Sequence, residues 1–158
     1  NESGRVNVFV IDLDGSDLVN LTGELPYDAS GPAWSPDGAR IVFSAYDTDV
    51  DLHILNLDGG GVTPLINDFM TEGGPDWSPD GTTILFTAMH GSDQGLHTIP
   101  ATGGDNDFLV PGGQFGRWSA DGGSVVFTTE NGGIFRATAN GSSVTPVDPS
   151  PDAWGPDW

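Results

Sequence analysis

The sequence predicts an all-β fold, a β-propeller of four-stranded antiparallel blades with three complete blades and a partial blade at each end. A tryptophan motif recurs along the 158 residues, at Trp34, Trp77, Trp118 and Trp158, with spacings of 43, 41 and 40 residues. This period is typical of propeller blades. No stretch has helical periodicity, and 24 glycines with 12 prolines interrupt the chain too often for long helices.

The repeat predicts the strands of each blade in order. A first strand leads into the turn Trp-Ser-Pro-Asp-Gly, or Trp-Ser-Ala-Asp-Gly in the third copy. The second strand is apolar on successive residues, so both of its faces must be covered, as they are between neighbouring blades. A third strand ends at a Gly-containing turn that suits a tight hairpin, and a short fourth strand closes the repeat. We expect second strands at 41–43, 84–86 and 125–127, third strands at 8–11, 52–55, 96–99 and 134–137, and fourth strands at 18–22, 62–65 and 144–147.

These strands divide the chain into a partial blade at 1–27, blades at 28–68, 69–111 and 112–150, and the start of a further blade at 151–158. Joining the two ends would give a blade that lacks its second strand. We therefore expect a longer parent chain, or a neighbouring chain that completes the blade. Unpaired strand edges recruit other chains, which predicts end-to-end self-association.

The chain is strongly acidic, because 23 Asp and Glu stand against four arginines and no lysine, for a net charge of -19. Such a surface repels nucleic acid and anionic lipid, and it attracts cations or basic partners. An ordinary solvated surface is the alternative. No apolar run reaches the ~18 residues that span a bilayer, so membrane insertion is not expected. The absence of cysteine excludes disulfides and thiolate metal sites.

The motif Pro-x-Trp-Ser-Pro-Asp-Gly, followed by an Ile-x-Phe strand and an aromatic-bearing strand that ends at Asp-Gly, resembles the TolB-type branch of the tryptophan–aspartate propeller repeats. The match covers nearly the whole chain, with three copies in register. The third-strand tyrosine of the family corresponds to Phe9, His53, His97 and Phe135, which is a departure. The resemblance implies a propeller scaffold that binds a protein or peptide, in the periplasm or outside the cell.

Several repeated residues are expected to be structural. The tryptophans should pack between blades. The aspartates of the turn, Asp37, Asp80 and Asp121, should cap local amide groups. His53 and His97 occupy the repeated aromatic position, where packing is expected and a transition-metal site is the alternative.

Two groups of residues are candidates for binding. The segment before each first strand lies near the mouth of the channel in a propeller, where an acidic rim could hold a cation or receive a basic peptide. Its residues are Asp28, Glu72, Gln114 and Asp152, and turn capping is the alternative role. The hairpin at 47–51 carries Asp47, Asp49 and Asp51, which could converge on Ca²⁺, although a solvated loop is favoured.

Catalysis is not expected, because a hydrolase needs a nucleophile, a base and an oxyanion site, and the sequence has no Gly-x-Ser-x-Gly motif. The first hypothesis is therefore a non-enzymatic binding scaffold of the cell envelope or extracellular space. The second is a structural subunit of an extracellular assembly or filament, joined through incomplete blades and possible calcium sites. The third is the propeller part of a prolyl oligopeptidase-like peptidase, which would need a separate hydrolase domain.

Overall fold

The computed structural model describes residues 4–66, 71–89, 93–153 and 155. All regular elements within these residues are β-strands, which confirms the all-β prediction. They are β1 (Phe9–Val10), β2 (Val19–Asn20), β3 (Asp28–Trp34), β4 (Arg40–Tyr46), β5 (Val50–Asn56), β6 (Gly61–Pro64), β7 (Glu72–Trp77), β8 (Thr83–Ala88), β9 (Gly95–Pro100), β10 (Asp107–Pro111), β11 (Gly113–Trp118), β12 (Ser124–Thr129), β13 (Ile134–Thr138) and β14 (Val144–Asp148).

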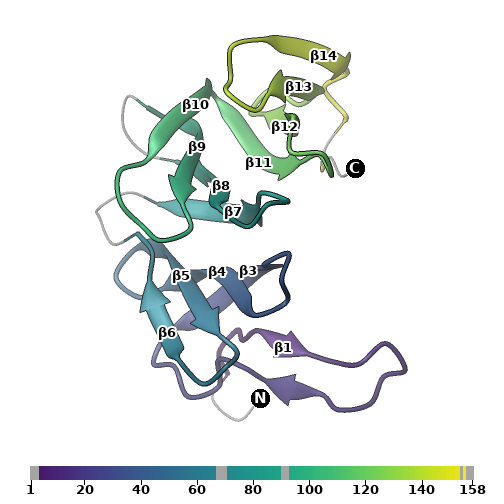
Figure 1. Cartoon of the computed structure of the whole chain (residues 1–158). Helices are drawn as coiled ribbons and strands as arrows, with labels where there is room; N and C mark the ends of the chain where they lie inside the picture. The colour runs from purple at the N-terminus through teal and green to yellow at the C-terminus, as the bar shows by residue number, and fades with distance from the viewer. Residues whose placement is uncertain (1–3, 67–70, 90–92, 154, 156–158) are drawn as a thin grey trace.

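The strands form three antiparallel four-stranded sheets and one hairpin. The sheets have the orders β3-β4-β5-β6, β7-β8-β9-β10 and β11-β12-β13-β14, and β1 pairs with β2. They follow one another along an open arc with β3, β7 and β11 on its inner side (Figure 1). This is the arrangement of consecutive propeller blades, each of which runs outward from its innermost strand.

The hydrophobic core lies between the sheets, in the two interfaces that we call the first seam (sheets β3–β6 and β7–β10) and the second seam (sheets β7–β10 and β11–β14). Successive residues of β8 face opposite seams: Ile84 and Phe86 pack in the first, and Leu85 packs in the second. All three side chains are at most 1% exposed. The prediction that second strands are covered on both faces is therefore confirmed.

Each innermost strand carries a β-bulge three residues before its tryptophan. The bulges interrupt the pairing between Ser30 and Ala33 in β3 and at the corresponding places in β7 and β11. The residue at the bulge has a left-handed backbone in all three strands, with φ of 59° at Gly31, 60° at Gly74 and 53° at Phe115. Glycine adopts this conformation without penalty, whereas a phenylalanine there is strained.

The tryptophans differ in burial according to what precedes them. Trp77 is 5% exposed because it packs against the complete sheet β3–β6, and Trp118 is partly buried in the second seam. Trp34 is 50% exposed, so the expected packing between blades is not seen for this residue. Only the two-stranded β1–β2 hairpin precedes its sheet, and a hairpin offers too little surface to cover the ring. Trp158 lies outside the described residues.

Hydrophobic side chains are exposed along the N-terminal segment. The largest exposed fractions in this segment belong to Leu13, Leu18 and Val6, at 111%, 62% and 54%. The β1–β2 hairpin lies next to the first sheet, on the side away from the first seam (Figure 1). End-to-end association through it stays a prediction. In the described part of the chain, no helix has the length and hydrophobicity to cross a membrane.

Candidate functional site

The starting ends of β3, β7 and β11 carry three of the residues that the sequence predicts at the channel rim. Asp28 opens β3, and its Oδ1 accepts a hydrogen bond of 3.0 Å from the backbone N–H of Val6. Asp28 also lines a small cavity of about 160 Å³ with Val6, Ser30 and Tyr46. The Ser30 hydroxyl donates to Tyr46 Oη at 3.1 Å, so these two polar groups interrupt a lining that is otherwise mainly apolar. Asp28 therefore combines local capping with access to a surface hollow.

Glu72 does not belong to this rim, which corrects the sequence prediction. Its side chain is only 1% exposed. Counted from the tryptophan, Glu72 stands five residues back, where β3 has Ala29 and β11 has Gly113, and both of these residues are buried. Asp28 stands six residues back from its tryptophan. Because alternate residues of a strand face opposite sides, this single-residue difference turns Glu72 into the molecule.

Gln114 lies on β11 next to the bulge and is half-buried. Its backbone carbonyl oxygen accepts a hydrogen bond of 3.3 Å from Thr128 Oγ1. Asp152 is exposed in the turn that follows β14. Asp28, Gln114 and Asp152 therefore stay predicted rim residues.

Phe115 is the residue at this end of the strands that the sequence analysis missed. Its side chain is 42% exposed. The backbone N–H of Phe115 donates to the buried Thr87 Oγ1 at 3.1 Å, which ties the strained bulge to the neighbouring sheet. A Cβ atom built on Gly74 would lie 3.6 Å from the Phe115 ring, so the ring reaches the adjacent innermost strand. The signal was present in the sequence, because the other copies have glycine three residues before tryptophan.

The aspartates at 47–51 are not assembled as a metal site. Asp47 is exposed and Asp49 is half-buried in the hairpin turn, whereas Asp51 belongs to β5 and is 7% exposed. The Asp47 N–H donates to the Asp49 carbonyl at 3.2 Å, which closes the turn through backbone groups. Within the ranges that the structure describes, no group of three or more His, Cys, Asp or Glu side chains is placed to hold a metal ion.

The two repeated histidines pack as expected. His53 Nδ1 lies 2.9 Å from Tyr27 Oη, and its ring meets Tyr27 and Phe43 edge-on, with centroid distances of 5.4 and 5.9 Å. Burial lowers the pKa of His53, and the nearby Asp47 charge partly opposes this shift. His97 is 5% exposed and lies against Phe86 and Phe108.

The finishing ends of the innermost strands carry the aspartate turns, which form as the sequence predicts. Asp37, Asp80 and Asp121 each accept hydrogen bonds from a serine hydroxyl two residues before them and from a backbone N–H two residues after them. These hydrogen bonds, chiefly that from the serine, lower the pKa of each aspartate below its usual value. The carboxylates are therefore ionised across the physiological range.

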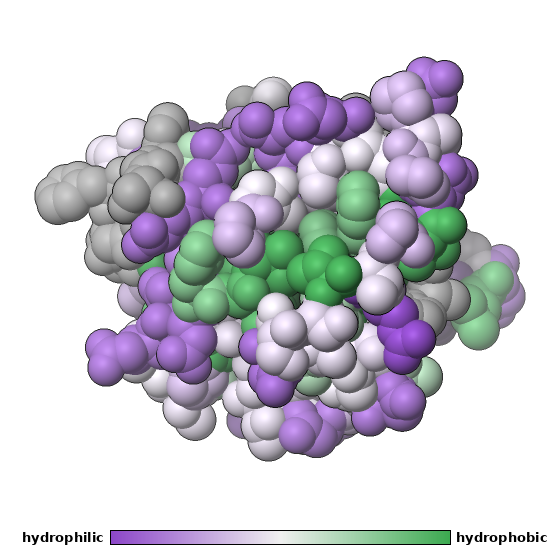
Figure 2. All heavy atoms as spheres, turned by 90° about the horizontal axis from the view of Figure 1, so that it is seen from above, coloured by the Kyte–Doolittle hydropathy of each residue, from purple (hydrophilic) through white to green (hydrophobic). Residues whose placement is uncertain are grey.

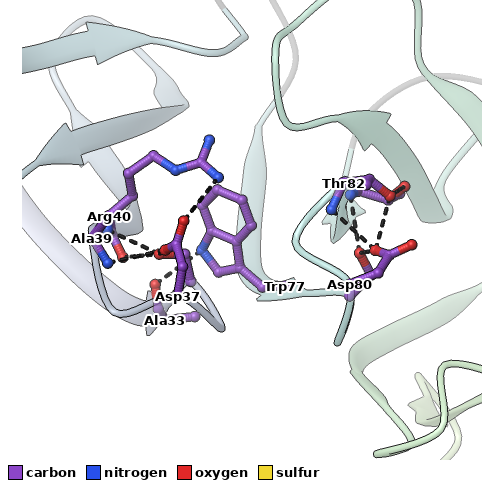
Figure 3. Close-up of polar contacts among 10 residues, drawn as sticks. Ala33, Asp37, Ala39, Arg40, Trp77, Asp80 and Thr82 are labelled. Carbon is purple, nitrogen blue, oxygen red and sulfur yellow. Dashed lines mark hydrogen bonds and ion pairs between the residues drawn. The ribbon is translucent and has the colours of Figure 1, made fainter.

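The first seam holds an arginine against its tryptophan. The Arg40 guanidinium carbon lies 4.6 Å from the centroid of the Trp77 ring, and Nη2 lies 3.8 Å from Asp37 Oδ2. Trp77 Nε1 donates to the Ala33 carbonyl at 3.2 Å. Figure 3 shows the Arg40 side chain extended across the indole with Asp37 beside it. Sequence analysis did not single out Arg40, since neither Thr83 nor Ser124 repeats it at the corresponding positions.

Viewed from above, the molecule shows a hydrophobic area surrounded by hydrophilic residues (Figure 2). On the described part of the chain, exposed hydrophobic side chains of the outer strands include Phe108 in β10 and Val144 and Val147 in β14. Exposed apolar side chains therefore occur on the outer strands as well as at the rim, and an outer-strand residue is available as a control for a rim residue.

A family model described as the TolB beta propeller domain matches residues 1–148. Similar solved structures include a protein from Agrobacterium tumefaciens assigned as TolB, with a TM-score of 0.82 and 22% identity over 92% of this chain and 57% of that chain. TolB from Acinetobacter baumannii has a TM-score of 0.79 and 19% identity, over 93% of this chain and 39% of that chain. A gluconolactonase from Xanthomonas campestris has a TM-score of 0.74 and 18% identity, over 94% of this chain and 57% of that chain.

A search of curated protein sequences gives no significant match. The chain spans less than two thirds of the length of each of these three solved structures. At such identities the likeness establishes the propeller fold, and the chemistry has to be argued from the residues of this chain.

Proposed function

The chain belongs to the TolB β-propeller domain family, and from this premise we propose that it is a non-enzymatic scaffold that binds a protein or peptide in the cell envelope. The proposed contact surface is the rim, which we define as Asp28, Gln114, Phe115 and Asp152. Propellers offer the ends and inner surfaces of their innermost strands to ligands, because these are the only strands that border the channel.

The observation that carries this proposal is the strained, exposed Phe115. A left-handed conformation costs a non-glycine residue about 1 kcal/mol or more, and such strain is concentrated at functional positions. An exposed aromatic ring offers a large contact area at low cost in side-chain entropy, which is why aromatic residues dominate binding hot spots. Phe115 therefore gives a partner a rigid anchor where the other repeats have only glycine.

The charge of the chain supports a basic partner. With a net charge of -19 and Asp28 on the wall of a surface hollow, the rim favours a peptide that carries Lys or Arg. Steering of this kind raises the association rate and weakens as salt screens the charges. Binding is therefore expected to slow when the ionic strength increases.

The test first identifies a partner by cross-linking in envelope extracts of the source organism. It then compares the affinities of the wild type, Phe115→Gly and Phe108→Ala for that partner. Phe115→Gly restores the residue of the other repeats, so the bulge should persist while the aromatic anchor is lost. Phe108 is similarly exposed, at 45%, but it lies on the outermost strand β10. We expect a cross-linked partner whose affinity falls about tenfold or more with Phe115→Gly and changes little with Phe108→Ala.

Equal affinities of wild type and Phe115→Gly for the identified partner would contradict the assignment of the rim. Circular dichroism and thermal melting of both variants check that each is folded. A partner that responds only to Phe108→Ala would move the binding surface to the outer strands.

A further inference from the structure

The two seams are built on the same frame. In each, a glycine of the later aspartate turn packs against a proline of the earlier one. A Cβ atom built on Gly81 would lie 3.7 Å from Pro36 Cδ, and one built on Gly122 would lie 3.7 Å from Pro79 Cδ. The backbone angles agree as well, with φ of 71° at Gly81 and 68° at Gly122. A side chain at one position of the first seam therefore has a defined counterpart in the second.

The second seam lacks the arginine that covers the tryptophan in the first. The residue that corresponds to Arg40 is Thr83, and the one that corresponds to Trp77 is Trp118. A cavity of about 430 Å³ lies at this place. Its walls come from both turns and include Asp80, Thr83, Trp118 and Asp121. The volume falls in the range of small-ligand pockets.

The Trp118 side chain makes fewer polar contacts than the side chain of its counterpart Trp77. Trp77 Nε1 donates to a carbonyl of the preceding sheet, and its ring is covered by Arg40. Trp118 Nε1 is buried and has no hydrogen-bond partner in the part of the chain that the structure describes. Trp118 is therefore held at the seam by the packing of its ring and by its backbone N–H, which donates to Asp76 Oδ2 at 2.7 Å. Its ring borders the cavity.

The cavity also carries negative charge. Asp80 lines it at the position that Asp37 occupies in the first seam. Asp80 and Asp121 accept their hydrogen bonds from the aspartate turns through Oδ1. In the first seam the corresponding Oδ1 of Asp37 makes the same turn contacts, and Oδ2 is the atom that meets Arg40. Asp80 Oδ2 and Asp121 Oδ2 are thus the atoms suited to a cation in the second seam.

Within the described residues, no arginine stacks on Trp118, although Arg136 is near enough to Asp121 for its charge to act on that carboxylate. The chain contains no lysine, and its four arginines contact other groups. Arg40 covers Trp77, and Arg136 Nη2 donates to Ser124 Oγ at 2.7 Å. Arg117 donates to the carbonyl of its neighbour Gly116 at 2.9 Å, and Arg5 donates to a carbonyl in the N-terminal segment. A cation that stacks on Trp118 therefore has to come from outside the chain.

We propose that the second seam binds a guanidinium group, carried by an arginine side chain of a protein partner. The planar guanidinium stacks on the Trp118 ring, as Arg40 does on Trp77, and donates to the carboxylates of Asp80 and Asp121. Guanidinium fits this site better than ammonium because it combines a flat face for the indole with several N–H donors at its edge. The site lies at the opposite ends of the innermost strands from the rim, so it does not depend on the proposed function.

The test follows the tryptophan indole N–H signals by NMR during titration with N-acetyl-arginine methylamide. The citrulline analogue, which has the same shape and no charge, serves as the control ligand. We expect the Trp118 signal to shift with the arginine probe, with binding about tenfold or more weaker for citrulline. A Trp118→Phe variant assigns the signal. Equal responses to the two probes would overturn the proposal.

Two exchanged variants supply an internal control. Thr83→Arg places an arginine of the chain in the second seam, so the Trp118 response to the probe should disappear. Arg40→Thr opens the first seam, so the Trp77 signal should begin to respond. An undiminished Trp118 response in folded Thr83→Arg would contradict the proposal, whatever the folding of Arg40→Thr. A final titration with the peptide Gly-Gly-Arg-Gly-Gly tests whether the guanidinium can belong to an arginine within a protein chain. That part of the proposal is wrong if N-acetyl-arginine methylamide binds and the peptide does not.

Discussion

Replacement of Arg40 by methionine should destabilise the first seam by about 1 kcal/mol or slightly more. Methionine keeps an apolar stem over Trp77 and removes the guanidinium, whose carbon lies 4.6 Å from the ring centroid. Cation–π contacts are worth about 0.5–1 kcal/mol when exposed and about 2 when desolvated, and the Arg40 side chain is 28% exposed. The ion pair with Asp37 adds little, because it spans 3.8 Å and the carboxylate is 57% exposed.

The assay is reversible thermal or urea unfolding of Arg40→Met, Arg40→Lys and the matched variant Thr83→Met. A loss of about 1 kcal/mol corresponds to about 2–4 °C in Tm for a chain of this length. Arg40→Lys should keep part of the stability, since it retains the charge but loses the flat stacking face. Thr83→Met has no guanidinium to remove, so its effect should be small.

Salt distinguishes the two contributions of Arg40. At 1 M ionic strength the Debye length falls to about 3 Å, so the exposed ion pair is screened while the contact with the indole persists. The difference between wild type and Arg40→Met should therefore remain at high salt. If that difference vanishes with salt, or if Thr83→Met loses as much stability as Arg40→Met, stacking on Trp77 is not what stabilises the seam.

Three further predictions test other parts of the structure. Gly95→Ala should lower the free energy of unfolding by about 3 kcal/mol or more, because the new Cβ would lie 2.2 Å from a carbonyl oxygen of β10. Gly81→Ala should lower it by only about 1 kcal/mol, since its Cβ would meet nothing closer than 3.7 Å. Urea unfolding that gives the two variants equal losses would refute this prediction. Stability should fall as the pH drops below 6.5, because the pKa of His53 is lower in the folded state, and His53→Phe should reduce this slope in pH-dependent melting. Stability should fall again as the pH drops through the acidic range around 3.8, because the pKa of Asp121 is depressed in the folded state, and a slope that is unchanged in Asp121→Asn would contradict the hydrogen-bond assignment.

The parts of the fold that depend on local sequence could be predicted. The aspartate turns form in all three copies because a serine, an aspartate and a glycine supply their own hydrogen bonds within five residues. The second strands are buried on both faces because their residues are apolar in succession. By contrast, β10 was missed, since residues 107–111 lack the Val-Thr-Pro pattern of β6 and β14.

The candidate site was predicted less well, because it depends on register and on neighbouring sheets. Asp28 and Glu72 both open an innermost strand, yet they stand six and five residues before their tryptophans and face opposite sides. Trp34 and Trp77 share one motif, but only Trp77 has a complete sheet before it. The cavity beside Trp118 is lined by residues of two repeats, so no single sequence motif predicts it.

Repeats within one chain allow each position to be compared with its counterparts in the same fold. Phe115 stands where the other repeats have glycine and strains the backbone, and Thr83 stands where the first sheet has Arg40, beside the cavity at Trp118. Backbone strain and an uncovered aromatic ring are both expected where a protein meets a ligand. They lie at opposite ends of the innermost strands, so two ligands could be held at the same time. The titration of Phe115→Gly with the arginine probe tests this independence, because the Trp118 response should be unchanged when the rim anchor is gone.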